Sequence, residues 1–249
     1  TRNYIKTCRK AYRNLSALGV DVDVISSEED YSSYSVIVAP MLYLLHPHVG
    51  ERMKQFVEQG GHLIATYVTG YVDENQLNYL GGFPGDGLKD LFGVISEEID
   101  TLYPSDRNRV HFGEMPEGEV RDYAEVLRVA DGTNVLGTYE QDYYKGMAAV
   151  TERTCKKGSA MYIAARLDDA SMQRLYARTL KKAGVSMYKL PYGVERHTRE
   201  ADGMQYVFYL NDTTEPQIVS GAQGIDLLTG EWIKGILTLE PYGVACVKE

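Results

Sequence analysis

Residues 36–75 constrain the fold more than any other part of the sequence, because they have the pattern of one parallel β-α-β unit. Val36–Ala39 is a short apolar run, typical of a strand buried inside a parallel sheet. Apolar residues then recur at helical spacing between 49 and 57, and Gly60 and Gly61 end the predicted helix. His62–Tyr67 follows as the second strand. The predicted framework is therefore an α/β domain with a parallel sheet.

The segments that follow these two strands, Pro40–Leu45 and Val68–Asn75, mark the place where chemistry is expected. In an open α/β sheet, sites form just beyond the carboxyl ends of the strands. Many such domains carry a reactive Cys or Ser at the strand-to-helix turn. Here the turn reads Tyr67-Val68-Thr69-Gly70, and no histidine with an acidic partner can be assigned to Thr69. The pattern predicts no catalytic nucleophile.

Composition excludes several classes of protein. The chain has 249 residues and a formal net charge of −9, which argues against a nucleic-acid partner because such a partner requires a basic face. No apolar run approaches the roughly 20 residues of a membrane span. Cys8, Cys155 and Cys246 are an odd number of widely spaced cysteines and form no metal or disulfide pattern. These features predict a cytoplasmic protein without a membrane or nucleic-acid partner.

The first residues have an unusual order for a parallel α/β domain. Tyr4–Leu18 has a helical pattern and is followed by a predicted strand, Val20–Ile25, whereas such domains normally begin with a strand that leads into the first helix. We therefore expect the chain to be a piece of a longer polypeptide, with the first strand of the domain missing.

The rest of the chain changes from parallel to antiparallel patterns. Short apolar runs separated by turns between residues 94 and 165 predict antiparallel strands added to the sheet, and Asp168 or Asp169 is expected to cap a helix that ends at Gly184. After a linker at residues 190–193, six short strands are predicted, with the rhythm of a small antiparallel β-sandwich. The predicted domains are residues 1–188 and 189–249. The six strands are Val194–Arg199, Gln205–Asn211, Gln217–Ser220, Gly224–Leu228, Ile236–Leu239 and Val244–Lys248.

Side chains that could carry chemistry have simpler structural explanations. His46 and His48 lack a third metal ligand at fixed spacing, so we predict neither a metal site nor a cofactor. Adjacent carboxylates on a strand point to opposite faces, which does not suit glycoside hydrolysis. For Asp73 in the strand-end loop, turn formation is favoured over a functional role. Trp232 is interpreted as a packed residue in a turn in preference to a sugar-stacking platform.

Several specific motifs are distributed over nearly the whole chain. They are Ala39-Pro40-Met41-Leu42-Tyr43-Leu44-Leu45, Gly60-Gly61, Thr69-Gly70-Tyr71-Val72-Asp73-Glu74-Asn75, Leu80-Gly81-Gly82-Phe83-Pro84-Gly85, Glu98-Ile99-Asp100, Tyr162-Ile163-Ala164-Ala165-Arg166, Leu228-Thr229-Gly230 and Pro241-Tyr242-Gly243-Val244-Ala245. Through these motifs the chain resembles the middle domain of the glycoside hydrolase family 42 β-galactosidases.

This resemblance implies a flavodoxin-like doubly wound sheet, similar to class I glutamine amidotransferases but without their nucleophile, with added antiparallel strands and a small antiparallel β domain. It implies trimerisation with copies of itself. It also implies a parent enzyme that hydrolyses terminal β-galactosides with two glutamates on a TIM barrel, where the galactoside would mainly bind. No residue of this chain matches those catalytic motifs, so none is predicted to be catalytic.

The resemblance and the strand-end position together suggest a set of residues for subunit contacts or for the wall of a neighbour's active site. Two other hypotheses remain open. One is a free-standing amidotransferase-like or sugar-utilisation enzyme, and the other is a carbohydrate-binding module that uses Trp232. The candidate interface or wall residues are Met41, Tyr43, Tyr71, Asp73, Asn75 and Phe83.

Overall fold

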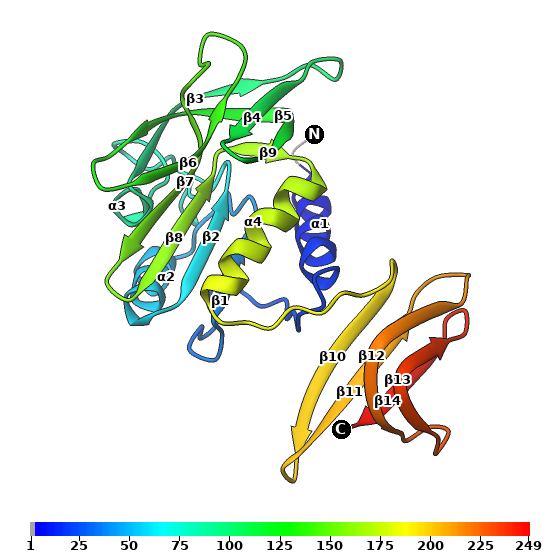
Figure 1. Ribbon diagram of the computed structural model, residues 1–249. Helices are drawn as coiled ribbons and strands as arrows, with labels where there is room; N and C mark the ends of the chain where they lie inside the picture. Colours follow the sequence, from blue (N-terminus) through cyan, green and yellow to red (C-terminus); the bar gives the residue numbers. More distant parts are fainter. Residues whose placement is uncertain (1–2) are drawn as a thin grey trace. The chain divides into compact units, whose positions relative to one another are not determined.

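The computed structural model describes residues 3–249 and divides into two compact units (Figure 1). The first takes in the described residues up to Ala11 together with Ile25–Gly184, and the second takes in Tyr12–Val24 and Val185–Glu249. Within residues 3–249, no helix is long and apolar enough to cross a membrane. The predicted domain boundary between residues 188 and 189 stays a prediction.

The first unit is built on a nine-stranded mixed sheet that contains the predicted β-α-β unit. β1 (Val36–Ala39), β2 (His62–Thr66) and β8 (Gly158–Ile163) are parallel neighbours, and α2 (Val49–Gln59) connects the first two. Gly60 ends α2 at φ 123°, where its N–H reaches the carbonyls of the last helical turn. The prediction of one parallel unit from residues 36–75 is confirmed.

The antiparallel strands continue the sheet beyond β8 in the order β7-β6-β4-β5-β3, and β9 pairs with β5. The prediction of added antiparallel strands is therefore confirmed. β5 is one long strand where the sequence indicated separate short runs, because it pairs with β3, β4 and β9 at different points along its length. The bounds are β3 (Val94–Thr101), β4 (Asn108–Phe112), β5 (Met115–Val129), β6 (Asn134–Tyr139), β7 (Ala148–Cys155) and β9 (Ala165–Leu167).

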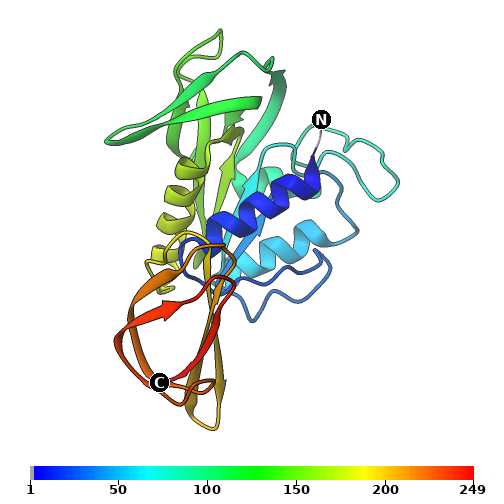
Figure 2. The ribbon, with the colours of Figure 1, turned by 90° about the vertical axis from the view of Figure 1, so that its right-hand side faces the viewer.

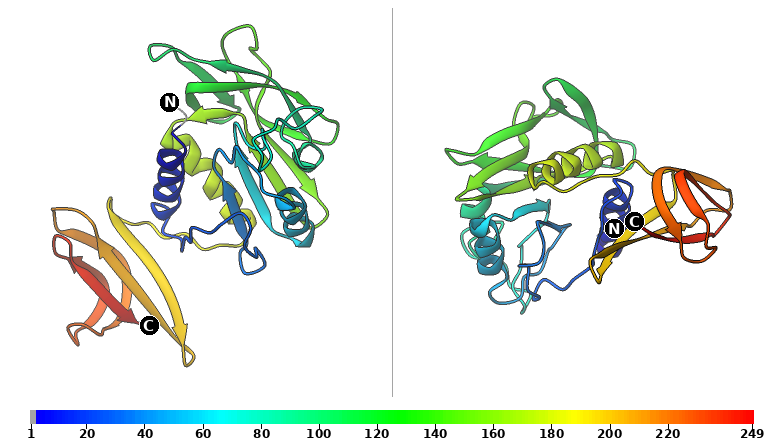
Figure 3. Two further views of the ribbon diagram at one scale, coloured as in Figure 1. Left: turned by 180° about the vertical axis from the view of Figure 1, so that it is seen from behind. Right: turned by 60° about the horizontal axis from the view of Figure 1, so that its bottom comes forward.

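Helices cover both faces of the parallel strands. Figures 1 and 3 show α2 on one face and α4 (Asp169–Lys182) on the other, with the beginning of α1 (Tyr4–Ser16) beside α4. The short helix α3 (Leu88–Phe92) packs on the same side as α2, where its Phe92 ring lies 5.3 Å from the Tyr162 ring of β8. Met53 and Val57 of α2 complete this core, which is fully enclosed. Burial of such side chains supplies most of the stability of a domain.

Asp168 is the cap of α4, which decides between the two residues suggested by the sequence. Its Oδ1 accepts the Ser171 N–H at 2.9 Å, and its Oδ2 accepts the Ser171 hydroxyl at 2.7 Å and the Glu119 N–H of β5 at 2.8 Å. Asp169 lies in the first turn, 3.4 Å from the Lys10 ammonium, at an exposed position. One carboxylate therefore joins the start of α4 to the sheet.

We predict that Asp168→Ala lowers the free energy of unfolding by about 2 kcal/mol, because capping residues contribute up to that amount and this one also binds β5. The control Asp169→Ala removes the exposed ion pair with Lys10 and should cost less than about 1 kcal/mol. Urea denaturation followed by circular dichroism measures both values. Equal losses in the two variants would contradict the assignment of the cap.

The second unit is one continuous five-stranded antiparallel sheet in the order β10-β11-β14-β12-β13, instead of the two facing sheets of a sandwich. The sheet curves strongly around its apolar face (Figures 2 and 3). β12 unites two strands that the sequence indicated separately, because a bulge between Ser220 and Gln223 interrupts its pattern but not its pairing. The bounds are β10 (Val194–Ala201), β11 (Met204–Asn211), β12 (Gln217–Asp226), β13 (Trp232–Leu239) and β14 (Val244–Lys248).

The strand predicted at Val20–Ile25 is absent, which corrects the sequence analysis. Its alternating Val and Asp residues suit a strand, but a strand also requires a neighbouring backbone with which to pair. Here the Asp21 side chain accepts the Thr198 N–H of β10 at 2.8 Å, while the Leu18 carbonyl accepts the Tyr188 N–H at 3.0 Å. A side-chain contact thus takes the place of a ladder of backbone hydrogen bonds.

Candidate functional site at the ends of the parallel strands

The turn after β2 has a strained backbone. Val68 adopts φ 62°, in the left-handed region that β-branched residues rarely enter. The Thr69 hydroxyl is fully buried and donates to the Thr66 carbonyl at 2.6 Å. The strained position is thus occupied by a valine, and the adjacent hydroxyl is used to close the turn. This geometry leaves the turn without an accessible nucleophile.

A buried carboxylate on β5 holds this turn in place. Glu125 has no exposed surface, and its Oε1 accepts the Val68 N–H at 2.8 Å and the Tyr71 hydroxyl at 3.0 Å. Its Oε2 accepts the Tyr162 hydroxyl of β8 at 2.7 Å. None of the three donors is a cation. A buried acid without an opposite charge is costly unless it is well hydrogen-bonded, so these contacts determine where the turn lies.

Burial controls the ionisation of Glu125. It raises the pKa of the carboxyl group from 4.5 to about 7, although the hydrogen bonds from Val68, Tyr162 and Tyr71 act in the opposite direction. The pKa of each tyrosine is raised, first by its own burial and then by the nearby Glu125 charge. Both phenols therefore keep their protons and act as donors to the carboxylate.

We predict that this carboxyl group makes the protein less stable as the pH rises. Between pH 4.5 and about 7, the carboxyl group of Glu125 is protonated in the folded state and ionised in the unfolded state. Its contribution to the free energy of unfolding is therefore complete below pH 4.5 and is lost as the pH rises to about 7 and beyond. The total loss is about 3 kcal/mol, at 1.4 kcal/mol for each unit of pKa. Chemical denaturation at a series of pH values measures it.

The Glu125→Gln variant should remove this part of the pH dependence, whatever its effect on stability at a single pH. Glu97→Gln, at an exposed position on β3, is the matched control. In this variant the free energy of unfolding should depend on pH as it does in the wild type. If the free energy of unfolding depends on pH in the same way in the wild type and in Glu125→Gln, the raised pKa of Glu125 is contradicted.

Aromatic side chains form a wall next to this carboxylate. The Tyr71 ring stacks on Phe83 with 3.9 Å between centroids and on Tyr43 with 6.1 Å between centroids. Met41 is buried in the same group, which we call the strand-end cluster. Four of the six candidate residues therefore lie together. The strand-end cluster comprises Met41, Tyr43, Leu44, Tyr67, Val68, Tyr71, Val72, Phe83, Ile99 and Tyr123.

The other two candidates, Asp73 and Asn75, lie in a turn beside the cluster. Asp73 Oδ1 accepts the backbone N–H groups of Asn75 and Leu77, each at 2.9 Å. This is the turn-forming role that the sequence favoured for Asp73, and it is confirmed. The turn leads into a loop where Leu77 and Leu80 are 63% and 98% exposed.

The sequence analysis did not identify Arg166 of β9 as a site residue. Its guanidinium lies 5.4 Å from the Tyr67 ring centroid and 5.2 Å from that of Tyr123, and Nε donates to the Tyr67 hydroxyl at 2.6 Å. Nη1 pairs with Asp122 at 2.7 Å, and Nη2 donates to the Thr7 hydroxyl at 3.2 Å. In the sequence it is an arginine directly after an apolar strand, at the end of the motif Tyr162–Arg166, and neither feature assigned it a role. Glu125 was missed for a similar reason, as one acid inside the run Tyr123–Val129.

One group in the described part of the chain has the spacing of metal ligands. Atoms of His111 on β4, Glu117 on β5 and Glu140 directly after β6 lie within 4.8 Å of one another. Arg109 already pairs with both acids, because its Nη1 is 2.9 Å from Glu117 and its Nε is 3.8 Å from Glu140. The arginine charge therefore occupies the place that a cation would take.

Comparison with known proteins identifies the class of this fold. Residues 1–186 match the family model described as the β-galactosidase trimerisation domain, and residues 193–249 match the β-galactosidase C-terminal domain. The chain therefore belongs to the β-galactosidase trimerisation-domain family.

Individual relatives agree with this family. The chain is 38% identical to the β-galactosidase Pbg of Clostridium perfringens over 99% of its own length, and 40% identical to BglY of Alicyclobacillus acidocaldarius. It spans about 37% of the length of each of these relatives. A β-galactosidase structure from Bacillus circulans sp. alkalophilus superimposes with a TM-score of 0.93 at 33% identity, over 99% of this chain and 38% of that one.

Proposed function

We propose that this chain is the assembly and support region of a cytoplasmic β-galactosidase. The parent enzyme would hydrolyse terminal β-galactosides with two carboxylates carried by a TIM barrel outside this sequence, where the galactoside would mainly bind. Residues 1–188 would form the trimerisation domain and residues 189–249 the C-terminal domain. The parallel strands with helices on both faces support a flavodoxin-like origin for the first of these.

The geometry of the turn after β2 is the observation that supports a non-catalytic role. Its strained residue is Val68, its hydroxyl on Thr69 is bound to a backbone carbonyl, and the nearby acid Glu125 is enclosed. A nucleophile requires an accessible atom with a base beside it. The same three residues instead make a rigid turn, which supports a structural role.

We expect the 249-residue chain alone to release no nitrophenol from a nitrophenyl β-galactoside and no ammonia from glutamine. The physical reason is the absence of an accessible nucleophile–base pair at the turn after β2. A spectrophotometric assay measures both reactions, with the intact parent enzyme as the positive control for the first. Activity that is abolished by Thr69→Ala would overturn the proposal in favour of an independent enzyme.

For subunit contacts, we infer that the strand-end cluster is the support and the adjoining exposed loop is the contact. Asp73 fixes the start of this loop through two backbone N–H groups, and Leu77 and Leu80 project from it into solvent. Exposed leucines on a loop anchored to a packed cluster suit a partner surface, because they lose little conformational freedom when they are buried. The inferred partner is another copy of this chain in a homotrimer.

We predict that Leu80→Asp combined with Leu77→Asp shifts the intact enzyme from trimer to monomer, because two charges would be buried at the contact. The control is Leu228→Asp, since Leu228 is 64% exposed, close to the 63% of Leu77, but lies in the second unit. Sedimentation velocity measures the mass of each variant. A trimer that survives the double substitution would exclude this loop from the interface.

A further inference from the structure

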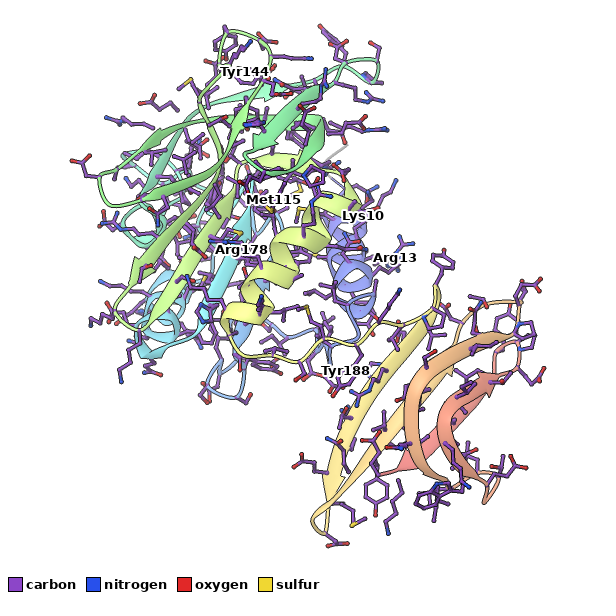
Figure 4. The ribbon with its side chains drawn as sticks, viewed as in Figure 1. Lys10, Arg13, Met115, Tyr144, Arg178 and Tyr188 are labelled. Carbon is purple, nitrogen blue, oxygen red and sulfur yellow. The ribbon has the colours of Figure 1, made fainter. Side chains whose placement is uncertain are left out.

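The five-stranded sheet of the second unit has apolar side chains on both faces. Its inner face is filled by its own core, in which Val207, Val219 and Val247 are buried. The Tyr188 ring, labelled in Figure 4, covers the Arg196 guanidinium on this side, with 3.8 Å between Cζ and the ring centroid. An antiparallel sheet that packs on one face normally turns polar residues toward solvent on the other. The outer face of this sheet departs from that rule.

Large apolar side chains lie exposed on the outer face of β12 and β13. Trp232 and Ile236 are 61% and 67% exposed and alternate with buried residues along β13, and Ile218 of β12 is 60% exposed. Ile225 of β12 pairs directly with Trp232, so their side chains are neighbours on one face. The interpretation of Trp232 as a packed residue was therefore wrong. These residues are called the outer patch, and a patch of this kind marks an interaction site.

Lysine side chains border the outer patch, although the chain as a whole carries a net charge of −9. Lys248 of β14 pairs directly with Ile225, and Lys234 lies two positions after Trp232 on the same face of β13. Apolar contact and charge complementarity together select a partner surface. The surface that fits this patch has an apolar centre with carboxylates at its rim.

Another segment of the same chain already packs against the β10 end of the outer face. Glu195 and His197 point to this face, since they alternate with inner-face residues along β10. The Tyr12 hydroxyl donates to Glu195 Oε2 at 3.2 Å, and Asp21 Oδ1 lies 3.8 Å from His197 Nδ1. The outer face is thus used for packing at β10 and is uncovered at β12 and β13.

We propose that the outer patch docks on the catalytic domain of the parent polypeptide, which lies outside this sequence. The inference rests on the proposed function for the identity of that domain. The chain spans about 37% of the length of relatives such as Pbg and BglY, so most of such a polypeptide is available as a partner. A domain on the same polypeptide is also present at a high effective concentration, which favours a contact of modest area.

The family matches favour this partner over a second copy of the chain. The model described as the trimerisation domain covers residues 1–186, whereas the outer patch lies in residues 193–249, which match the separate C-terminal domain. The description of self-association therefore attaches to the other part of the chain. The outer patch is left for a contact within the polypeptide.

Thiol labelling in the outer patch tests the proposal. Ile236→Cys is made in the 249-residue chain and in the intact parent enzyme, and its reaction with N-ethylmaleimide is followed by peptide mass spectrometry. The reaction should be at least about tenfold slower in the intact enzyme, because a buried thiol reacts only when the contact opens. Tyr242→Cys is the matched control, since Tyr242 is 66% exposed in the turn before β14 and should react equally fast in both proteins.

Equal rates at residue 236 in the two proteins would overturn the proposal, because the patch would then be free in the enzyme. Protection that is lost on dilution, in either protein, would identify a second copy as the occupant and would also overturn it. Hydrolysis of a nitrophenyl β-galactoside by the intact enzyme is measured in parallel. Its absence would contradict the proposed function, while the labelling rates would still decide whether the patch is covered.

A charge reversal tests the acidic rim of the partner surface. Lys234→Glu, in the intact enzyme that carries Ile236→Cys, should raise the labelling rate severalfold, because the new carboxylate would face other carboxylates. Lys189→Glu, at an exposed position before β10, is the control and should leave the rate unchanged. An unchanged rate with Lys234→Glu would overturn the proposed partner surface.

Discussion

The hydrogen bonds of the Glu125 carboxylate are the interaction on which the first unit depends. They join three elements that are distant in sequence, because the donors are Val68 after β2, Tyr71 in the following loop and Tyr162 on β8. The carboxylate lies where the parallel strands end and the antiparallel strand β5 crosses the sheet. Without these donors a buried acid would be strongly unfavourable, so the turn, the loop and the strand are positioned together.

The same arrangement explains why an architecture that commonly carries chemistry is used here as a support. The strand-end turn is fixed by buried groups that bind one another, and Val68 of this turn shares a cluster with the stacked rings of Tyr43, Tyr71 and Phe83. Buried groups that satisfy one another in this way indicate a structural role. In the second unit, Trp232 is 61% exposed, so the interpretation of it as a packed residue was wrong.

Elements with strong periodicity could be predicted from the sequence. The β-α-β unit at residues 36–75 was recognisable because its helix has one apolar face and its strands are wholly apolar. Four of the six candidate residues also proved to be neighbours, since the ends of adjacent parallel strands meet at one edge of a sheet. Glu125 and Arg166 could not be predicted, because each is a single charged residue within or after an apolar run, and such residues are normally exposed.

The sequence by itself determined the order and type of most elements, the family, and the lack of a nucleophile at the strand-end turn. These follow from spacing and residue type, which are local properties of the chain. The tertiary structure decided whether Val20–Ile25 formed a strand, whether Trp232 was packed and which partners Glu125 found. Each of these depends on groups far away in sequence, because a strand needs a neighbour and a buried charge needs donors. The β-α-β unit of residues 36–75 therefore determines the framework of the first unit. The contacts from β5 and β8 determine the conformation of the turn at the end of β2.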